Sequence, residues 1–150
     1  MLVHLGQVHA PLRRAEHEPD GAHRTLGGAA PVADAVVRVH EALRAAELRA
    51  HEGIGAEVID LRTLEPLDRD TILHSVLRTR RAVVAEEGWR TVGVGAEIAS
   101  QIHEALFYEL EAPVQRVAAA DVPTPYAANL EKLALPDAQR IVEAVLKITL

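Results

Sequence analysis

The residues best placed for chemistry are two neighbouring carboxylates, Glu86 and Glu87, which directly follow the apolar run 82–85. In a pair of carboxylates, one can act as a general acid and the other as a general base. Neighbouring residues in a strand point to opposite sides, however, so these two cannot face each other across one substrate. We therefore favour a structural role, in which one of them accepts hydrogen bonds from the N–H groups of the turn that follows.

That turn is rich in glycine and surrounds the only tryptophan. Gly93 and Gly95 begin a stretch that resembles a dinucleotide fingerprint, but Ile98 stands where the third glycine belongs. Free N–H groups at a helix start can also hold an anion. We favour the simpler interpretation that the glycines allow tight packing between a strand and a helix. Open α/β sheets bind ligands at the carboxyl ends of their strands. This predicts a crevice there, formed by Glu86, Trp89, Asp121 and Tyr126.

Other searches for catalytic and metal-binding patterns are negative. The chain has no cysteine, which excludes disulfides and thiolate catalysis. Ser75 and Ser100 are the only serines, and neither lies in a G-x-S-x-G motif. The pairs His40-Glu41 and His103-Glu104 lack the second histidine of a zinc-binding H-E-x-x-H helix. We predict no assembled catalytic site and no metal site.

Composition narrows the class of protein. Apolar residues make up 49% and charged residues 25% of the 150 residues, which is typical of a globular domain. The net charge of −6 argues against nucleic acid and membrane surfaces as partners, and permits a basic partner. No apolar run approaches the roughly 20 residues of a membrane span, and the first residues do not resemble a secretory signal. We expect a cytoplasmic protein.

Apolar periodicity predicts alternating helices and strands from residue 32 onward. This alternation predicts a three-layer α/β/α sandwich with a mostly parallel sheet. We expect 56–61, 82–86 and 114–118 to be adjacent parallel strands, and missing edge strands to come from residues 1–37. Helices are expected over 34–52, from Asp68 or Asp70 to about 78, over 95–108 and around 141–148, with a long loop over 119–136.

Residues 1–31 differ from the rest. They hold four of the eight histidines, three prolines and no lasting periodicity, although residues 2–5 suit a short strand. We predict an irregular N-terminal arm over 1–31 and one domain over 32–150.

Three motifs carry a resemblance to a known family. They are IDLRTL-x-PLD, EEGW followed by G-x-GAEI, and R-V-x-x-x-DVP-x-PYA, and they occur within 57–72, 80–99 and 111–136. In this order they resemble the carboxyl-terminal, transketolase-type domain of the beta subunit of thiamine-diphosphate-dependent 2-oxoacid dehydrogenases. The resemblance covers roughly residues 36–150. The EEGW motif resembles the pyruvate and acetoin dehydrogenase subunits more than the branched-chain ones.

The resemblance implies a subunit of a multienzyme complex, with a second beta-type chain (a homodimer), an alpha subunit and an acyltransferase core as partners. The family docks a basic domain of the acyltransferase through acidic groups of this domain, which here suggests Glu109, Glu111 and the terminal carboxylate of Leu150. The whole net charge of −6 lies in residues 51–150, which hold sixteen acidic and ten basic side chains. The full family enzyme uses thiamine diphosphate and Mg.

The chain also departs from the family pattern. GGAAPVADAVVR is a poor strand where relatives have one of the type V-T-V-V, and many relatives carry a glycine where Val92 stands. Nothing in residues 1–35 resembles the preceding domain that holds the cofactor's pyrimidine ring, and there is no Gly-Asp-Gly. We therefore expect a truncated or split beta subunit that binds no cofactor and is not catalytic alone. The alternatives are a freestanding small-ligand or regulatory binding module, or a nonfunctional remnant.

Overall fold

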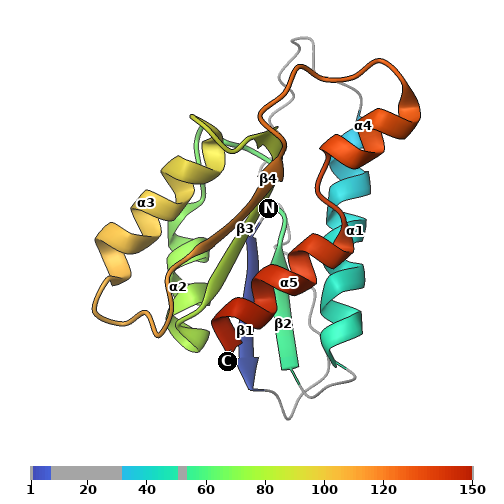
Figure 1. Ribbon diagram of the computed structural model, residues 1–150. Coiled ribbons are helices and arrows are strands. Elements are labelled where there is room, and N and C mark those ends of the chain that lie inside the picture. Colours follow the sequence, from blue (N-terminus) through green and yellow to red (C-terminus); the bar gives the residue numbers. More distant parts are fainter. Residues whose placement is uncertain (1, 8–31, 51–53, 150) are drawn as a thin grey trace.

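The computed structural model describes the backbone of residues 2–7, 32–50 and 54–149 (Figure 1). The predicted alternation of helices and strands is confirmed, with boundaries shifted by a few residues. In chain order the elements are β1 (Leu2–Gln7), α1 (Val32–Ala50), β2 (Ile54–Ile59), α2 (Arg69–Thr79), β3 (Ala82–Trp89), α3 (Val94–Leu106), β4 (Gln115–Ala119), α4 (Ala128–Ala134) and α5 (Ala138–Thr149).

The four strands form one sheet in the order β2-β1-β3-β4. β3 and β4 are parallel neighbours, as predicted, and β2 runs in the same direction, because β1 is antiparallel to both β2 and β3. The prediction that strands 56–61 and 82–86 are adjacent is wrong, since β1 lies between them. The N-terminal strand is interior rather than an edge. An interior strand can pair its N–H and C=O groups on both sides, which stabilises this position.

The division into an arm over 1–31 and a domain over 32–150 stays a prediction, because residues 8–31 lie outside the described residues. Within the first 31 residues, Leu2–Gln7 belongs to the sheet. The poor strand that precedes the helix in the sequence is replaced, in the described part, by the start of α1 at Val32.

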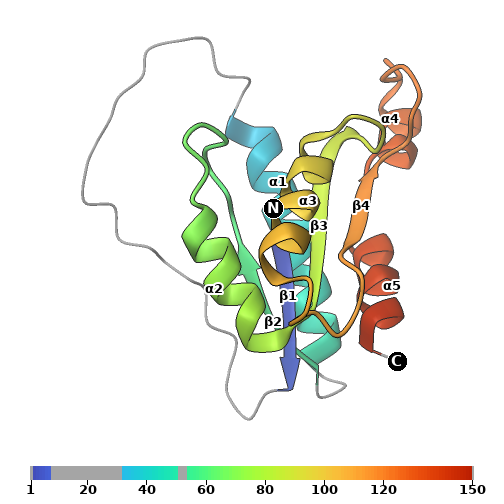
Figure 2. The same ribbon diagram turned by 90° about the vertical axis from the view of Figure 1, so that its left-hand side faces the viewer.

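Helices cover both faces of the sheet and confirm the three-layer sandwich. Figure 1 shows the sheet nearly edge-on, with α2 and α3 on one side and α1 on the other, and in Figure 2 the strands stand side by side with α2 and α3 in front of them. α1 and α5 pack on one face, against side chains that include Val58 and Val83. α2 and α3 pack on the other face, against Ile59 and Val84. Successive strand residues thus enter different cores, as the alternation of a strand requires.

The connection between β2 and α2 is fixed by a helix cap. The carboxylate of Asp68 accepts a hydrogen bond from the backbone N–H of Thr71 at 3.1 Å, which confirms the predicted start of α2. Arg80 ends the helix in a left-handed conformation with φ 58°. The Asp68 cap thus fixes where the loop that follows β2 ends and α2 begins.

Helix α4 lies in the segment 119–136, for which we expected a loop. Seven residues give too few apolar repeats for periodicity to detect. None of its residues is buried. Among the helices of the described part of the chain, none is long and apolar enough to cross a membrane.

Candidate functional site

The pairing of β3 with β4 is interrupted at the two glutamates. Ala85 pairs with Val117 and the next pair is Trp89 with Ala119, so β3 spans four residues where β4 spans two. Such a bulge changes the direction in which side chains point. The strict alternation of β3 therefore ends after Ala85, and the carboxylate of Glu86 reaches the start of α3.

Both oxygens of Glu86 are engaged there. Oε2 accepts a hydrogen bond from the backbone N–H of Gly95 at 2.9 Å, and Oε1 accepts one from Nη2 of Arg116 at 2.7 Å. The two side chains are only 12% and 15% exposed. The first N–H groups of a helix have no partner within it and form the positive end of its dipole, so a carboxylate stabilises them. The structural role predicted for one glutamate is confirmed.

The glycines of the turn allow this approach. A Cβ atom on Gly95 would overlap the Glu86 carboxylate, and one on Gly93 would overlap that carboxylate and the carbonyl oxygen of Trp89. Only glycine fits where groups approach this closely. The interpretation of the glycines as a packing requirement is confirmed, and Glu86 itself supplies the anion at this helix start.

The turn after β3 is also tied to the loop after β4. Thr91 donates its backbone N–H to one oxygen of Asp121 at 3.2 Å and its hydroxyl to the other at 2.6 Å. Trp89 Nε1 donates to the carbonyl oxygen of Val122 at 3.0 Å. The Thr91 hydroxyl above all, followed by its backbone N–H, holds the pKa of Asp121 below its ordinary value, because both stabilise the charged carboxylate. Asp121 thus links the turn after β3 to the loop after β4 through hydrogen bonds.

A cavity of about 610 Å³ lies at the carboxyl ends of β2 and β3, where open α/β sheets bind ligands. Its walls include residues 60–62 after β2, residues 84–89 of β3, the turn to α3 and Val39 of α1. Asp60 and Arg62 on its lining form an ion pair at 2.9 Å. Apolar walls with a few polar groups are typical of ligand pockets.

The structure brings part of the predicted crevice together. Glu86 and Trp89 line the cavity, and Asp121 binds Thr91, which also lines it. Sequence reasoning missed Arg116 as the partner of Glu86. The available signal was an arginine within an apolar strand, because buried charges are paired.

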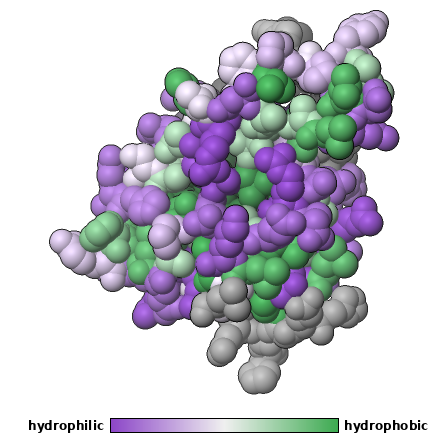
Figure 3. All heavy atoms as spheres, viewed as in Figure 1, coloured by the Kyte–Doolittle hydropathy of each residue, from purple (hydrophilic) through white to green (hydrophobic). Residues whose placement is uncertain are grey.

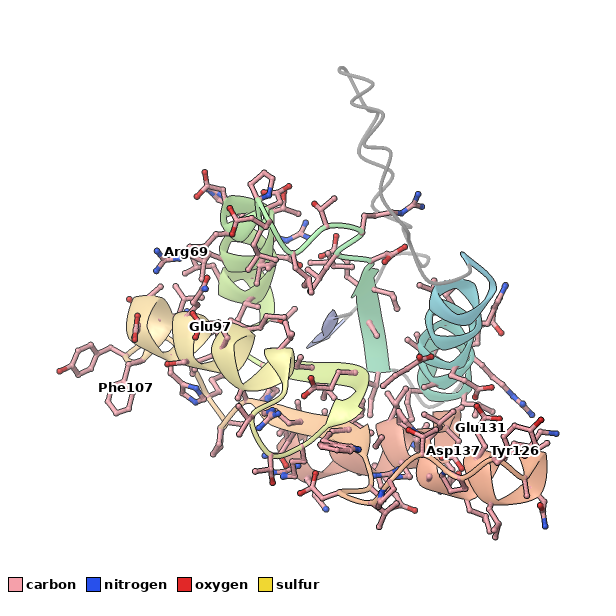
Figure 4. The ribbon with its side chains drawn as sticks, turned by 90° about the horizontal axis from the view of Figure 1, so that it is seen from above. Arg69, Glu97, Phe107, Tyr126, Glu131 and Asp137 are labelled. Carbon is pink, nitrogen blue, oxygen red and sulfur yellow. The ribbon has the colours of Figure 1, made fainter. Side chains whose placement is uncertain are left out.

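Tyr126 is the exception among the predicted crevice residues. Its side chain is fully exposed, and it is absent from the lining of the cavity. In Figure 4, which views the molecule from above, Tyr126 lies beside Glu131 of α4, across the molecule from Glu97 of α3. Tyr126 therefore belongs to the surface near α4.

The predicted docking residues differ from one another. Glu111 binds Arg81 Nη2 at 2.7 Å and lies 3.5 Å from Arg80 Nη1, and its backbone N–H donates to the carbonyl oxygen of Arg80 at 2.9 Å. Glu109 is exposed. Leu150 lies outside the described residues. Docking through these residues stays a prediction, and of the two glutamates Glu111 is the one that ion pairs with arginines engage.

Mg²⁺ needs oxygen ligands, and among the described residues no three or more His, Asp or Glu side chains are grouped closely enough to hold a metal ion. The most buried carboxylate at the strand ends, Glu86, has both oxygens engaged. That the chain binds no cofactor stays a prediction.

Comparison with known proteins identifies relatives of this domain. Residues 37–141 match the family described as transketolase, C-terminal domain. The pyruvate dehydrogenase E1 component subunit beta of Dictyostelium discoideum is 42% identical over 139 residues, covering 93% of this chain and 37% of the relative. Subunit beta-1 of Arabidopsis thaliana is 58% identical over 103 residues, covering 69% and 28%. The chain thus spans about a third of the length of these relatives.

A solved structure shares the fold. The chain described as a split gene transketolase, inactive beta4 tetramer, superposes with a TM-score of 0.54 at 29% identity. The match covers 75% of this chain and 35% of that one.

Proposed function

Because the chain belongs to the transketolase C-terminal domain family, in the form found in pyruvate dehydrogenase beta subunits, we propose that it serves subunit assembly in a 2-oxoacid dehydrogenase. In this proposal it contributes no catalytic group of its own. It contacts a second beta-type chain and an alpha subunit, and it docks the acyltransferase core of a pyruvate- or acetoin-type complex. The relatives are each named as a subunit beta of an E1 component, which supports a role as one subunit of an assembly.

The observation that carries the proposal is the exposure of α4. None of its seven residues is buried, and the side chains of Leu130 and Leu133 are 50% and 78% exposed. Isolated helices shorter than about 12 residues are marginal in water, and most helices are stabilised by packing an apolar face. A second protein surface on Leu130 and Leu133 would provide that packing.

The neighbourhood of α4 supports a contact of useful size. Apolar atoms gather over α4 at the upper right of Figure 3. Tyr126 and Val122, just before the helix, are also exposed. We call Val122, Tyr126, Leu130 and Leu133 the α4 surface. Exposed apolar side chains that gather in one region of a surface mark protein interaction sites.

A freestanding binding module is the second candidate, favoured by the cavity at the strand ends. This candidate predicts a monomer that binds its ligand without a second chain. The two candidates therefore differ in the mass of the protein in solution.

The test is light scattering coupled to gel filtration on the chain and on the double variant Leu130→Lys with Leu133→Lys. We expect the unmodified chain to form a dimer or larger assembly and the variant to be monomeric, because lysine on the α4 surface cannot be buried at the contact. The matched control is Leu48→Lys with Leu77→Lys, whose side chains are 48% and 45% exposed on α1 and α2. A monomeric unmodified chain, or an assembly that survives the α4 substitutions, would contradict the proposal.

A further inference from the structure

Strand β4 is an edge of the described sheet. Among the described strands it pairs only with β3, and in Figure 2 it stands last in the row of strands, beside β3. An edge strand presents a row of N–H and C=O groups that can pair with a strand of another molecule. Folded proteins protect such edges, often with charged side chains. The groups that contact the outer side of β4 therefore decide whether it can pair.

Two arginine side chains hold carbonyl oxygens of β4. Nη1 of Arg90 donates a hydrogen bond to the carbonyl oxygen of Arg116 at 2.7 Å. Nη2 of Arg140 donates one to the carbonyl oxygen of Ala118, also at 2.7 Å. Both bonds carry the charge of a guanidinium group, which makes them stronger than bonds between neutral groups.

These two carbonyl oxygens lie on the outer side of β4. Main-chain groups of residues two apart in a strand point to the same side, so residues 116, 118 and 120 share one side. The backbone N–H of Ala120 donates to the carbonyl oxygen of Ala134, the last residue of α4, at 2.9 Å. A side that is bonded to α4 is not the side that pairs with β3. Arg90 and Arg140 therefore hold the edge itself.

The two arginines reach the edge from opposite faces of the sheet. Arg90 lies in the turn that leads from β3 into α3, which packs on one face, and Arg140 lies in α5, which packs on the other. The position of Arg90 is fixed by Arg116, whose Nη2 donates to the carbonyl oxygen of Arg90 at 2.7 Å. The edge thus carries two positive charges, one from each face.

We propose that Arg90 and Arg140 prevent the β4 edge from pairing with the β4 edge of a second copy of this chain. Two identical edges related by a two-fold axis pair antiparallel, because residue i then meets j and j meets i. Centred on Val117, this arrangement pairs Arg116 of each copy with Ala118 of the other. A hydrogen-bonded pair exchanges both of its N–H···O bonds. The carbonyl oxygens that it needs are the two that the arginines hold, and four guanidinium groups would meet at the contact.

The test removes the two guanidinium groups from the full 150-residue chain. The variant is Arg90→Met with Arg140→Met, because methionine keeps an unbranched apolar side chain but has no charge and no N–H donor. It is made together with Leu130→Lys and Leu133→Lys, so that the α4 surface does not contribute to association. The parent for comparison carries the two lysines only.

Two measurements report pairing of β4. Light scattering should show a dimer of the methionine variant where the parent shows a monomer. The backbone amides of Arg116 and Ala118 should exchange with solvent at least about tenfold more slowly at high than at low protein concentration. This second measurement is specific to β4, so it tests the proposal whether or not the α4 surface mediates assembly. Protected amides of Val83 to Ala85, inside the sheet, show that the variant is folded.

Matched variants separate the edge from a general effect of charge. Arg44→Met with Arg69→Met removes two exposed arginines from α1 and α2 and should leave mass and amide exchange unchanged. Arg90→Lys with Arg140→Lys keeps a charge at each edge position and should remain unpaired. If the methionine variant does not fold, alanine at both positions makes the same comparison.

Three outcomes would overturn the proposal. The first is a folded methionine variant with the mass and the amide exchange of its parent. The second is equal association of the control that lacks Arg44 and Arg69, or of the lysine variant. The third is association without protection of the amides of Arg116 and Ala118, because the copies would then meet at another surface.

Discussion

Glu86 and Gly95 are joined by a hydrogen bond of 2.9 Å from the backbone N–H of Gly95 to the carboxylate of Glu86. This bond closes the turn between β3 and α3 and places a negative charge at the start of the helix. The residue that looks most like an acid or base catalyst is therefore part of the scaffold. The hydrogen bonds of Glu86 to Gly95 and Arg116 hold it in place on the cavity lining.

Replacing Glu86 with glutamine should destabilise the domain. Glutamine keeps an oxygen that can accept from Gly95, but it loses the charge that pairs with Arg116 at low exposure. We expect the free energy of unfolding in urea to fall by about 2 kcal/mol. Glu104→Gln, at an exposed position of the same helix α3, should change it by less than about 0.5 kcal/mol. Equal stability of the two variants would show that the Glu86 charge does not hold the turn.

The bond between Thr91 and Asp121 predicts a pH effect with a definite sign. The pKa of Asp121 in the folded chain lies below its ordinary value of 3.8, so the stabilisation is complete above that pH and is lost as the pH falls through the folded pKa. Thr91→Val removes the hydroxyl and should raise the pKa of Asp121, measured by carboxyl-carbon NMR titration. Thr124→Val, at an exposed position in the same loop as Asp121, should leave it unchanged. An unchanged pKa in Thr91→Val would mean that the hydroxyl is not the cause.

Valine at position 92 is expected to make the domain less stable than glycine would. Its φ of 61° lies in the left-handed region, and its side chain is 95% exposed, so it gains little from packing. Val92→Gly removes about 1–2 kcal/mol of strain but adds unfolded-state freedom, for a net gain of about 0.5–1 kcal/mol. Thermal unfolding should show a higher midpoint. Val122→Gly, exposed and outside the left-handed region, should lower it.

The strand, glycine turn and helix from Ala82 to Leu106 were predictable because each depends on local features. These features are an apolar run, glycines and helical spacing. The partners of Glu86 were harder to predict, since the bulge that turns its side chain arises from pairing with β4, thirty residues away. Cap and turn chemistry is local, whereas the direction of a bulged side chain is not.

The position of β1 within the sheet could not be predicted from the sequence either. Residues 2–7 have the composition of a short strand, but their neighbours in the sheet are decided by contacts with 54–59 and 82–84. Strand propensity reports how well a segment suits a pleated surface, not which partners it takes. Helix α4 was missed for a different reason, since its seven residues give too few apolar repeats for periodicity to detect.

The two acidic docking candidates should behave differently. Glu109→Gln should slow association with a basic acyltransferase binding domain and flatten its salt dependence, because an exposed charge acts mainly by steering. Glu111→Gln should instead lower the free energy of unfolding by less than about 1 kcal/mol, since its partly exposed pairs with Arg80 and Arg81 are lost. Surface plasmon resonance at two salt concentrations measures the first effect. If Glu109→Gln leaves the rate and its salt dependence unchanged, Glu109 is not part of a docking site.

The purified chain should neither bind thiamine diphosphate nor decarboxylate pyruvate. The sequence has no Gly-Asp-Gly, and the described residues lack an oxygen cluster for Mg²⁺. Titration calorimetry with thiamine diphosphate and Mg²⁺ should give no saturable heat. Stoichiometric binding of the cofactor would contradict the expectation and point to the undescribed residues.

The antiparallel middle strand has a consequence for how the chain is made. Translation proceeds from the N-terminus, so residues 2–7 leave the ribosome long before residues 54–59 and 82–84, to which they pair. Contacts between such distant segments form slowly, because a long loop must close first. During synthesis the nascent chain therefore carries this strand without a partner until β2 has emerged, and with one open edge until β3 has emerged. In that interval the strand is exposed to chaperones and to other nascent chains.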